Sequence, residues 1–578
     1  MINLFKYLKP YSWPIVFLII LTIGQVFSNL SLPDYTAHII NDGIVGGNQS
    51  VIYSYGLIML LIALGGGILT VGAGYFSARI GTGFAKDIRD AVFTKIEGFS
   101  LVEFNTFSTA SLITRSTNDI QQIQMVLIML LRLALMAPFM GVMAIIKAYA
   151  LAPGMTWIMT VAVVTLIAVI AMIFSIALPR FKQLQKLVDR LNLVTREILT
   201  GLRVIRAYDK EKYEENKFRE SNKILTDVNL FVNRLMTILQ PAMMLIMSIT
   251  SIAIVWYGAH QIDLGNLAIG DMLAFMQYAM QAIFAFLMLS IIFIMVPRAA
   301  VSAERIAEVL ASKPVIQDPQ NPIKAPHLGG KVEFKNVSFS YVGAEAPVLA
   351  DISFSANPSE TTAIVGSTGS GKSTVINLIP RFYDVTKGEI LVDGVDVRKM
   401  TQNDLRSRIG YVSQKAMLFS GTIKENIAYG SHDLKTEDIE HSATVAQATD
   451  FIQGLEGKFE SHIAQAGANF SGGQKQRLSI ARALAKKPEI YIFDDSFSAL
   501  DFKTDAALRK ALESETKGKT MIVVAQRIST IMHAEKIIVL ESGKIVGEGT
   551  HAELMKSSPV YQEIASSQLS EKELEDIK

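Results

Sequence analysis

The chain has 578 residues, half of them hydrophobic, and a mean hydropathy of +0.32, a balance that points to a membrane protein. Its formal net charge of +2 lacks the excess of basic residues that a nucleic-acid-binding surface needs, so we expect no nucleic-acid partner. It contains no cysteine, which excludes disulfides, thiolate nucleophiles and zinc–thiolate sites.

Long apolar runs are confined to residues 1–300. Each approaches or exceeds the ~20 residues that span the hydrocarbon core of a bilayer as a helix. We interpret the first run as a retained helix rather than a secretory signal, because it lacks a clear cleavage site and further spans follow. The sequence therefore predicts six transmembrane helices, at Ile15–Leu32, Tyr55–Phe76, Met125–Ala148, Met155–Leu178, Met236–Tyr257 and Met272–Val296.

Basic residues indicate the orientation of these helices. The segments 33–54 and 258–271 contain no lysine or arginine, whereas 79–118 and 180–234 are rich in both. The positive-inside rule then places both termini, and the domain that follows, in the cytoplasm. The exception is Lys147, at the outer end of the third span, which we interpret as a side chain that snorkels to the interface.

The two basic segments are predicted to be helical. The pattern over 190–225 has few helix breakers apart from Gly201, and the pattern over 79–120 is interrupted near 104–111. Spans four and five should therefore continue as helices well beyond the membrane. The predicted domains are a transmembrane domain over 1–310, a linker rich in proline and glycine over 311–330, and a nucleotide-binding domain over 331–578.

The last domain alternates strand-like and helix-like patterns, so the expected fold class is a membrane α-helical domain plus an α/β P-loop NTPase domain. A phosphate-binding loop lies in "TTAIVGSTGSGKST" (361–374), where backbone N–H groups can surround phosphate oxygens. Lys372 should reach the β- and γ-phosphates of ATP, and Ser373 should bind Mg²⁺ together with Asp494, at the end of an apolar strand. The predicted loop residues are Gly366, Ser367, Thr368, Gly369, Ser370, Gly371, Lys372, Ser373 and Thr374.

Between these two motifs lies "FSGGQKQRLSIARAL" (470–484). With a P-loop about a hundred residues earlier and an acidic strand end soon after, the chain resembles an ATP-binding cassette (ABC) transporter over essentially its whole length. The resemblance implies an exporter-type half-transporter. Two such chains pair, and each ATP lies between the P-loop of one chain and the signature motif of the other.

The resemblance also implies roles for further residues. Tyr341 matches the aromatic residue that stacks on adenine, and Gln414 matches the glutamine that links Mg²⁺ to the transmembrane helices. The stretches near 104–111 and 201–210 look like the two coupling helices. The signature is implied at Ser471, Gly472, Gly473 and Gln474, and the D-loop at Ser498, Ala499, Leu500 and Asp501.

Three positions depart from the family pattern. Asp495 replaces the glutamate that polarises the attacking water, and Gln526 replaces a histidine that contacts the γ-phosphate. The third is "HIAQAG" (462–467), which lacks the usual acidic stretch. With Gln414, Asp495 and Gln526 form the predicted catalytic set, and their pattern indicates a site that holds ATP but splits it slowly. The chain then resembles one subunit of a heterodimeric bacterial multidrug exporter in the cell membrane, with a second ABC half-transporter as its partner.

The expected substrate is a small hydrophobic or amphipathic compound. Nineteen of the 24 methionines lie in residues 1–300, and thioethers adapt to varied apolar ligands, although methionine can also be simply a membrane-compatible hydrophobe. Arg132 and Gln277 are the candidate substrate residues, with Gln25, Gln240 and Gln281 as further polar positions. Arg132 can equally snorkel or form a salt bridge.

Two other functions stay open at this point. One is a homodimeric exporter of lipid or peptide in which Asp495 works as a slow base. The other is an ATP-gated regulatory or channel-like membrane protein that binds nucleotide without pumping. Import is also compatible with the sequence, although no residue pattern favours it.

Overall fold

A computed structural model describes residues 2–431 and 434–568 of the chain. The chain separates into two compact units. One unit contains the residues up to Glu97 together with Thr109–Ser312, and the other contains Gly98–Ser108 together with the residues from Lys313 onward. The second unit therefore includes a short segment that lies, in the sequence, between two helices of the first.

The first unit is built from helices throughout its described residues. Two of its helical stretches, η2 and η3, are π-helical, and η1 and η4 are 3₁₀ helices. The elements are η1 (Ile2–Tyr11), α1 (Ser12–His38), η2 (Ile39–Val45), α2 (Gln49–Glu97), α4 (Thr109–Ser116), α5 (Asn118–Met129), η3 (Leu130–Ala134), α6 (Leu135–Leu151), η4 (Pro153–Met155), α7 (Thr156–Thr200), α8 (Leu202–Ala207), α9 (Glu211–Asp263) and α10 (Ile269–Ala311).

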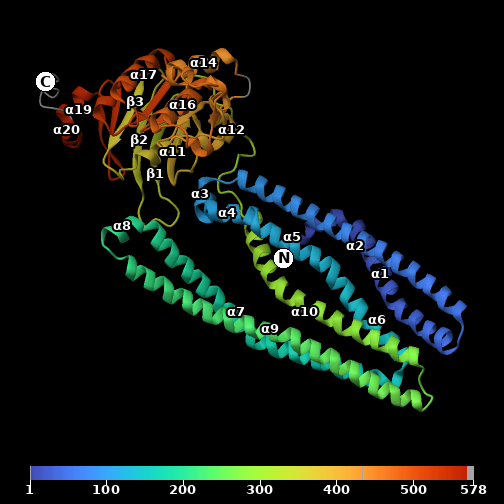
Figure 1. The fold of residues 1–578 in the computed structure, drawn as a ribbon. Helices are drawn as coiled ribbons and strands as arrows, with labels where there is room; N and C mark the ends of the chain where they lie inside the picture. The colour runs from blue at the N-terminus through green and yellow to red at the C-terminus, as the bar shows by residue number, and fades with distance from the viewer. Residues whose placement is uncertain (1, 432–433, 569–578) are drawn as a thin grey trace. The chain divides into compact units, whose positions relative to one another are not determined.

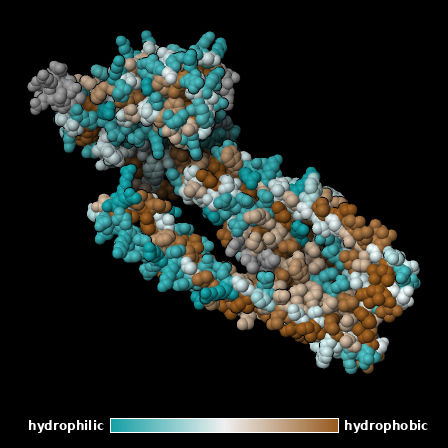
Figure 2. All heavy atoms as spheres, in the orientation of Figure 1, coloured by the Kyte–Doolittle hydropathy of each residue, from teal (hydrophilic) through white to brown (hydrophobic). Residues whose placement is uncertain are grey.

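Among the described residues of this unit, six helical stretches are long and apolar enough to cross a membrane, which confirms the six predicted spans. Large apolar side chains such as Trp13, Leu64 and Ile68 are exposed on the helices, as they would be against lipid. Figure 2 shows extensive hydrophobic surface over this unit, whereas the part of the second unit that it shows is mostly hydrophilic. The stretches are Leu4–Val45, Gln49–Glu97, Thr109–Leu151, Pro153–Thr200, Glu211–Asp263 and Ile269–Leu289.

The predicted extension of spans four and five beyond the membrane is confirmed. Helices α7 and α9 have 45 and 53 residues, about twice the ~20 that a bilayer requires. They lie side by side over much of their length and are joined through α8 (Figure 1). The break falls at Gly201, which caps the end of α7 through its N–H and the carbonyl of Glu197.

Lys147, predicted to snorkel to the interface, has an ion-pair partner that the sequence did not indicate; its snorkelling stays a prediction. Lys147 Nζ lies 2.6 Å from Asp34 Oδ2, and the Tyr278 hydroxyl donates to Asp34 Oδ1 at 2.5 Å. This cluster joins α1, α6 and α10. A carboxylate and an ammonium compensate each other's charge in an apolar setting. The sequence alone did not show that Asp34 and Lys147 would form this pair.

The second unit contains an antiparallel sheet and a mostly parallel sheet. The antiparallel sheet has the strand order β2-β1-β4-β5, and the other has the order β12-β11-β3-β10-β9-β6, in which only β12 is antiparallel. The strands are β1 (Val332–Phe339), β2 (Leu349–Ala356), β3 (Thr361–Gly366), β4 (Lys387–Val392), β5 (Val395–Asp396), β6 (Ile409–Val412), β7 (Gly421–Thr422), β8 (His462–Ile463), β9 (Ile490–Asp494), β10 (Thr520–Val524), β11 (Lys536–Glu541) and β12 (Lys544–Gly549).

Helices and loops surround these sheets, with β7 and β8 paired as a separate ribbon. The 3₁₀ turns of this unit are η5 (Val397–Lys399), η6 (Lys458–Glu460) and η7 (Gln465–Gly467). Its α-helices are α3 (Leu101–Phe107), α11 (Lys372–Leu378), α12 (Gln402–Ser407), α13 (Ile423–Ala428), α14 (Thr436–Val445), α15 (Thr449–Gln453), α16 (Gly472–Ala485), α17 (Phe502–Glu515), α18 (Ile528–Ile531), α19 (His551–Ser557) and α20 (Pro559–Ser566).

The parallel sheet is buried on both faces. Alternate residues of one strand enter different cores: Tyr491 and Phe493 of β9 pack in one cluster, whereas Ile490 and Ile492 pack in the other. Because side chains alternate across a strand, this requires a nearly continuous apolar run, which is the pattern of the sequence. The fold class predicted for this domain, an α/β P-loop NTPase, is confirmed.

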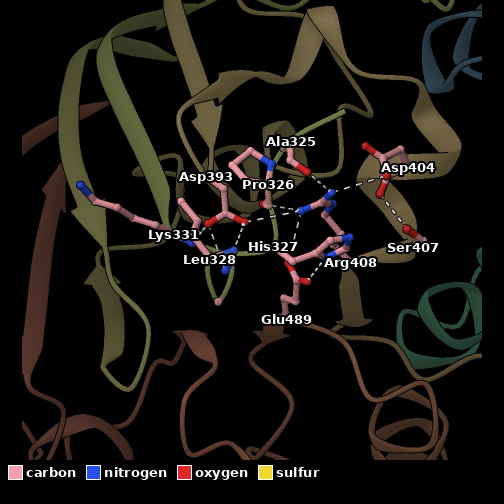
Figure 3. Close-up of polar contacts among 12 residues, drawn as sticks. Ala325, Pro326, His327, Leu328, Lys331, Asp393, Asp404, Ser407, Arg408 and Glu489 are labelled. Carbon is pink, nitrogen blue, oxygen red and sulfur yellow. Dashed lines mark hydrogen bonds and ion pairs between the residues drawn. The ribbon is translucent and has the colours of Figure 1, made fainter. Parts of the chain in front are cut away.

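The segment predicted as a linker packs against the second unit. The guanidinium of Arg408, 3% exposed, donates to the carbonyls of Ala325 and Pro326 at 2.6 and 2.9 Å and approaches Glu489 and Asp393. Asp393 in turn accepts from the backbone N–H groups of residues 330 and 331 (Figure 3). The chain before β1 is therefore held by buried charge rather than left as a free tether.

Candidate functional site: a nucleotide pocket at the ends of parallel strands

Four neighbouring parallel strands bring the predicted site residues to one edge of the sheet. β3 leads into the P-loop, β9 ends at Asp494, and β6 and β10 are followed within two residues by Gln414 and Gln526. In the register of the sheet Asp494 lies opposite Val524, and Val524 lies opposite Ile364. The carboxyl ends of parallel strands share one edge, which explains why residues far apart in sequence meet.

The P-loop has the geometry of a phosphate cradle. A Cβ at Gly366 would lie 2.1 Å from the carbonyl oxygen of Leu540, and Gly371 has φ +101°, so neither position accepts another residue without strain. The hydroxyl of Ser370 is buried and has no hydrogen-bond partner among the described residues. A loop that turns its backbone amides inward and leaves a polar atom unsatisfied fits a bound triphosphate.

Lys372 is the cation of this loop. Its ammonium donates to the carbonyls of Gly366 and Ser367, each at 2.8 Å. Burial lowers the pKa of Lys372, and the nearby carboxylates of Asp494 and Asp495 oppose that shift. A half-buried ammonium next to the loop can exchange its contacts with neutral carbonyls for a charged phosphate, which is the stronger interaction.

Asp494 and Ser373 lie together, as a shared Mg²⁺ site requires. Ser373 Oγ is 3.4 Å from Asp494 Oδ1. Burial raises the pKa of Asp494, and the charge of Asp495 adds to this shift, while the Ser373 hydroxyl and Lys372 oppose it. A buried carboxylate next to a second one is stabilised by a divalent cation, so the donor set of these two residues fits Mg²⁺ with phosphate oxygens as further ligands.

Asp495 is held by two amides. Its Oδ2 atom accepts from Gln526 Nε2 at 2.9 Å and from Gln414 Nε2 at 3.1 Å. Asp495 is 8% exposed and has φ +47°, in the left-handed region that aspartate adopts more readily than most residues. The three residues predicted as catalytic thus contact one another, because Gln414 and Gln526 both donate to the same carboxylate oxygen of Asp495. Sequence reasoning missed this contact.

Tyr341 stands at the side of the P-loop. Its hydroxyl is 3.1 Å from Thr374 Oγ1, and its ring packs edge-to-face against Tyr383 and Phe339. Beside it lies a cavity of about 340 Å³, lined also by Asn105 of α3 and Asp384. None of the P-loop residues lines this cavity, so the stacking of Tyr341 on a nucleobase stays a prediction, supported only by its contact with Thr374.

The signature residues lie at the start of α16, and no hydrogen bond joins them to the P-loop in the described part of this single chain. Ser471 caps α16, with Ser471 Oγ accepting from the Gln474 N–H and Gln474 Oε1 accepting from the Ser471 N–H. A Cβ at Gly472 would meet nothing within 4 Å, and one at Gly473 would lie 3.2 Å from the carbonyl of Ala499. The N-terminus of α16 is therefore open to an anion from outside the chain.

Asp501 caps the following helix, α17. It accepts from the Thr504 N–H at 2.9 Å and from the Thr504 hydroxyl at 2.8 Å. These hydrogen bonds lower the pKa of Asp501. Asp501 thus has a structural role as the N-cap of a helix. Its predicted contact with nucleotide would be a second role.

The two candidate substrate residues fall in different surroundings. Gln277 of α10 lines a groove of about 590 Å³ between α9 and α10. Arg132 lies in the π-helical turn η3, is exposed, and has no carboxylate partner among the described residues. Gln281, named only as a further polar position, lines the same groove as Gln277, whereas Gln25 is buried beside Met136.

The predicted coupling segments form short helices. α3 belongs to the second unit, where Glu103 Oε1 accepts from the Val315 N–H at 3.0 Å and the Asn105 amide lies 3.4 Å from the Tyr383 hydroxyl. α8 belongs to the first unit and exposes Val204, with Tyr208 directly after it also exposed. Sequence reasoning located both segments, but the role of Glu103 was missed, although its spacing after Ser100 is that of a capping box.

Six membrane-spanning helices followed by a P-loop ATPase domain define a nucleotide-driven membrane transport protein. Residues 15–286 match the sequence family "ABC transporter transmembrane region", and residues 349–498 match the family "ABC transporter". The chain belongs to the ABC transporter family. It is an integral membrane protein with an ABC-type ATPase domain that binds ATP.

Related proteins agree with this assignment. An uncharacterized ABC transporter ATP-binding protein of Mycobacterium tuberculosis (strain CDC 1551 / Oshkosh) is 41% identical over 97% of both chains. An ATP-dependent lipid A-core flippase of Pseudomonas aeruginosa is 32% identical over 90% of this chain and 86% of its own. The solved structure of a bacterial Atm1-family ABC exporter with ATP bound has a TM-score of 0.81 at 24% identity, covering 97% of this chain and 99% of that one, which shows the shared fold.

Proposed function

We propose that this chain is one half of a heterodimeric ATP-driven exporter of hydrophobic or amphipathic compounds in a bacterial cell membrane. Both termini and the nucleotide-binding domain lie in the cytoplasm. The nucleotide site built on its own P-loop binds Mg-ATP and hydrolyses it slowly. Its signature motif completes the faster site of a partner half-transporter.

The capping of Asp495 by two amides is the observation that carries this proposal. A general base must place a free oxygen within hydrogen-bond reach of the attacking water. An aspartate carboxylate is about 1.5 Å shorter in reach than that of a glutamate, and one of its oxygens already accepts twice. A displacement near 1 Å can cost about a hundredfold in rate, so this carboxylate is a poor base.

Gln526 reinforces the same effect. Its amide donates to Asp495 rather than standing free, and glutamine carries no positive charge with which to stabilise a γ-phosphate in the transition state. The P-loop, Ser373 and Asp494 nevertheless keep the groups that hold a triphosphate and its cation. The site thus keeps the groups that bind ATP, whereas Asp495 and Gln526 are poorly suited to catalysing its hydrolysis.

Mg²⁺ would be held by Ser373 and Asp494, with Gln414 Oε1 as a further oxygen ligand, since only Gln414 Nε2 donates to Asp495. When bound, the cation would neutralise the charge that develops on the β- and γ-phosphate oxygens.

A second candidate is a homodimeric exporter of lipid that hydrolyses ATP slowly at two equal sites. The similarity to lipid A-core flippases of Pseudomonas species favours it, at 31 to 34% identity. In this case Asp495 would be the working base of both sites. The two candidates differ in whether the chain by itself sustains turnover.

Steady-state ATPase measurement on the chain purified alone, in detergent and in lipid vesicles, tests the proposal. We expect turnover close to that of the Lys372→Ala control, while fluorescent ATP analogues still bind. Sustained turnover stimulated by lipid would favour the homodimer and contradict the slow-site proposal.

Affinity purification from native membranes, followed by mass spectrometry, tests the partner. We expect a second half-transporter that has a glutamate after its own strand-end aspartate and a histidine at the position of Gln526. Recovery of this chain alone, as a dimer, would contradict the heterodimer.

A further inference from the structure

The loop that carries Gln526 has a weakly capped helix at its far end. This loop connects β10 with α18, and Gln526 donates from it to Asp495. Arg527 is the N-cap residue of α18, but its side chain makes no capping hydrogen bond. The first N–H groups of a helix have no partner within the helix, so another group or water must satisfy them.

Gln568, two residues after the end of α20, supplies such a group. Gln568 Oε1 accepts from the Ile528 N–H at 2.9 Å, and Gln568 Nε2 donates to the carbonyl of Gln526 at 2.8 Å. One side-chain amide thus bonds the backbone on both sides of Arg527. Two parallel hydrogen bonds fix the orientation of a loop as well as its distance, which a single hydrogen bond does not.

Gln568 is itself attached to a well-packed helix. Tyr561 and Ala565 of α20 are fully buried in the same hydrophobic cluster as Ile528 of α18. The Gln568 N–H donates to the carbonyl of Ala565 at 3.0 Å, so its backbone is bonded to the end of α20. The side chain of Gln568 therefore holds the loop from a fixed position.

The loop held in this way contacts the nucleotide site at two points. Gln526 Nε2 lies 2.9 Å from Asp495 Oδ2, and Arg527 donates to the carbonyl of Ser498, in the D-loop, at 3.4 Å. A hydrogen bond weakens steeply with distance, so a shift of about 1 Å in the backbone of residue 526 would break the contact with Asp495. The position of this backbone thus decides whether Gln526 reaches the carboxylate.

We propose that Gln568 is a positioning residue of the slow nucleotide site, because its amide fixes the loop over 526–528 and so keeps the Gln526 amide on Asp495. Gln568 acts through the backbone of this loop and not on the reacting atoms. The inference rests on the proposed function, in which Gln526 restrains Asp495. The end of the last described helix thereby takes part in setting the rate of ATP hydrolysis.

Hydrogen exchange of the full chain without nucleotide, measured by mass spectrometry, tests the contact. Gln568→Ala should raise exchange about fivefold in the peptide that contains Ile528, since this N–H loses its acceptor. Gln568→Glu keeps the acceptor but loses the donor, so it should retain part of the protection. The matched control is Gln562→Ala, because Gln562 of α20 donates to the carbonyl of Met555 in α19 and should not affect this peptide. Unchanged exchange in Gln568→Ala would overturn the inference.

Turnover at the slow site tests the positioning. It is measured as phosphate release by the complex with Gly472→Asp present in every sample, which disables the partner's faster site. Gln526→Ala frees Asp495 from one donor, and we expect this variant and Gln568→Ala each to raise kcat about threefold with KM for ATP unchanged. When Gln526→Ala is already present, Gln568→Ala should have no further effect. A threefold effect of Gln568→Ala in both backgrounds would overturn the inference, because Gln568 would then not act through Gln526.

Failure of this inference is distinct from failure of the proposed function. If Gln526→Ala leaves the slow-site turnover unchanged, Gln526 does not restrain Asp495 and the slow-site proposal is contradicted. Raised exchange in Gln568→Ala would in that case still support the positioning of the loop. If Gln526→Ala raises turnover and Gln568→Ala does not, the slow-site proposal is kept and the role of Gln568 is refuted.

Discussion

The nucleotide site depends on a few residues around one carboxylate oxygen. Asp495 accepts hydrogen bonds from both Gln414 and Gln526, so the effect of substituting Asp495 depends on these two glutamines. A longer side chain at position 495 would extend toward the attacking water, but Gln526 would still donate to it. The left-handed backbone at this residue adds a small cost for any side chain larger than aspartate.

Asp495→Glu should therefore raise ATP turnover only modestly, by a few-fold, and Asp495→Glu with Gln526→His by about a hundredfold. The comparison uses steady-state phosphate release by the complex with Gly472→Asp present in every sample, which disables the partner's faster site, so that the turnover measured is that of the slow site. Full turnover in Asp495→Glu alone would show that Gln526 does not restrain the site. The Asp494→Asn variant is the inactive reference, because it removes the expected cation ligand.

Arg408 shows what a single buried charge contributes to the second unit. Its guanidinium joins the segment before β1 to Glu489 and Asp393, and it is almost fully buried (Figure 3). Removing it would leave those carboxylates without their cation. Breaking a buried ionic network from one side costs about 3–5 kcal/mol, far more than a surface pair.

Arg408→Met should thus lower the opening free energy of the segment around Ala325 by about 3 kcal/mol, measured by hydrogen exchange with mass spectrometry. The matched control is Lys335→Ala, which breaks an exposed pair with Glu389 at 3.9 Å and should change protection by less than about 1 kcal/mol. Equal effects of the two variants would contradict the structural role of Arg408.

At the scale of elements, α3 is held to the second unit by its own cap. Glu103 is 5% exposed and uses one oxygen for the Ser100 N–H and hydroxyl, and the other for the Val315 N–H. One side chain thereby begins the helix and binds it to the chain ahead of β1. α3 is therefore fixed to the nucleotide-binding unit although it follows α2 in sequence.

Glu103→Ala should release α3 and increase hydrogen exchange over residues 98–108, because a hydrogen bond to a buried charge is worth about 1.5–3 kcal/mol. We also expect substrate-stimulated ATP turnover of the assembled transporter to fall toward its basal rate. Glu103→Gln keeps an acceptor and suits a capping box, so it should retain most of the protection. Unchanged exchange in Glu103→Ala would show that other contacts hold α3.

The cluster of Asp34, Lys147 and Tyr278 plays a similar part in the membrane unit. It ties α1, α6 and α10 together through one carboxylate. Near it, the Asn41 side chain accepts from the Gly270 N–H at 2.7 Å and donates to Asp271 at 3.0 Å. The beginning of α10 is thus fixed to η2, which directly follows α1, by polar contacts.

Lys147→Met should lower the melting temperature in detergent, since it leaves Asp34 without its cation. Asp34→Asn combined with Lys147→Met should recover part of the loss, and the coupling free energy from the double-mutant cycle should be about 1–3 kcal/mol. Additive effects of the two substitutions would show that the ion pair contributes little.

At the scale of the whole molecule, each nucleotide site would need parts of two chains. The signature at the start of α16 forms its own capping box and has open space at Gly472. The pairing of this end with another chain's nucleotide is part of the proposed function. With this pairing, the P-loop and the signature motif of this chain would serve different nucleotide sites, so a mutation in one motif would affect one site only.

In the assembled heterodimer, Gly472→Asp should reduce ATP turnover by at least about a hundredfold, because a carboxylate would meet the phosphate that the helix N-terminus attracts. Asp495→Asn should leave most of the turnover intact, since it lies in the slow site. The measurement is phosphate release by the purified complex. Equal, severe losses in both variants would instead indicate two equivalent sites, as in a homodimer.

The sequence by itself determined the local features of this protein. The six spans, the long helices α7 and α9, and the P-loop follow from apolar run length, helical periodicity and glycine spacing, all of which are encoded within short windows. The departures from the family pattern at Asp495 and Gln526 could also be identified from the sequence, because neighbouring motifs fix their positions along the chain. Interactions between neighbours in sequence are enough to decide these features.

Only the tertiary structure decided which distant residues meet. The convergence of Gln414 and Gln526 on Asp495 arises because β6, β9 and β10 are adjacent parallel strands, and the pairing of Lys147 with Asp34 arises because α1 packs on α6. The contact of Gln568 with the loop of Gln526 likewise depends on the packing of α20 and α18 in one hydrophobic cluster. Hydrogen bonds and ion pairs act over only a few ångströms, so partners separated by many residues are set by packing and not by spacing along the chain.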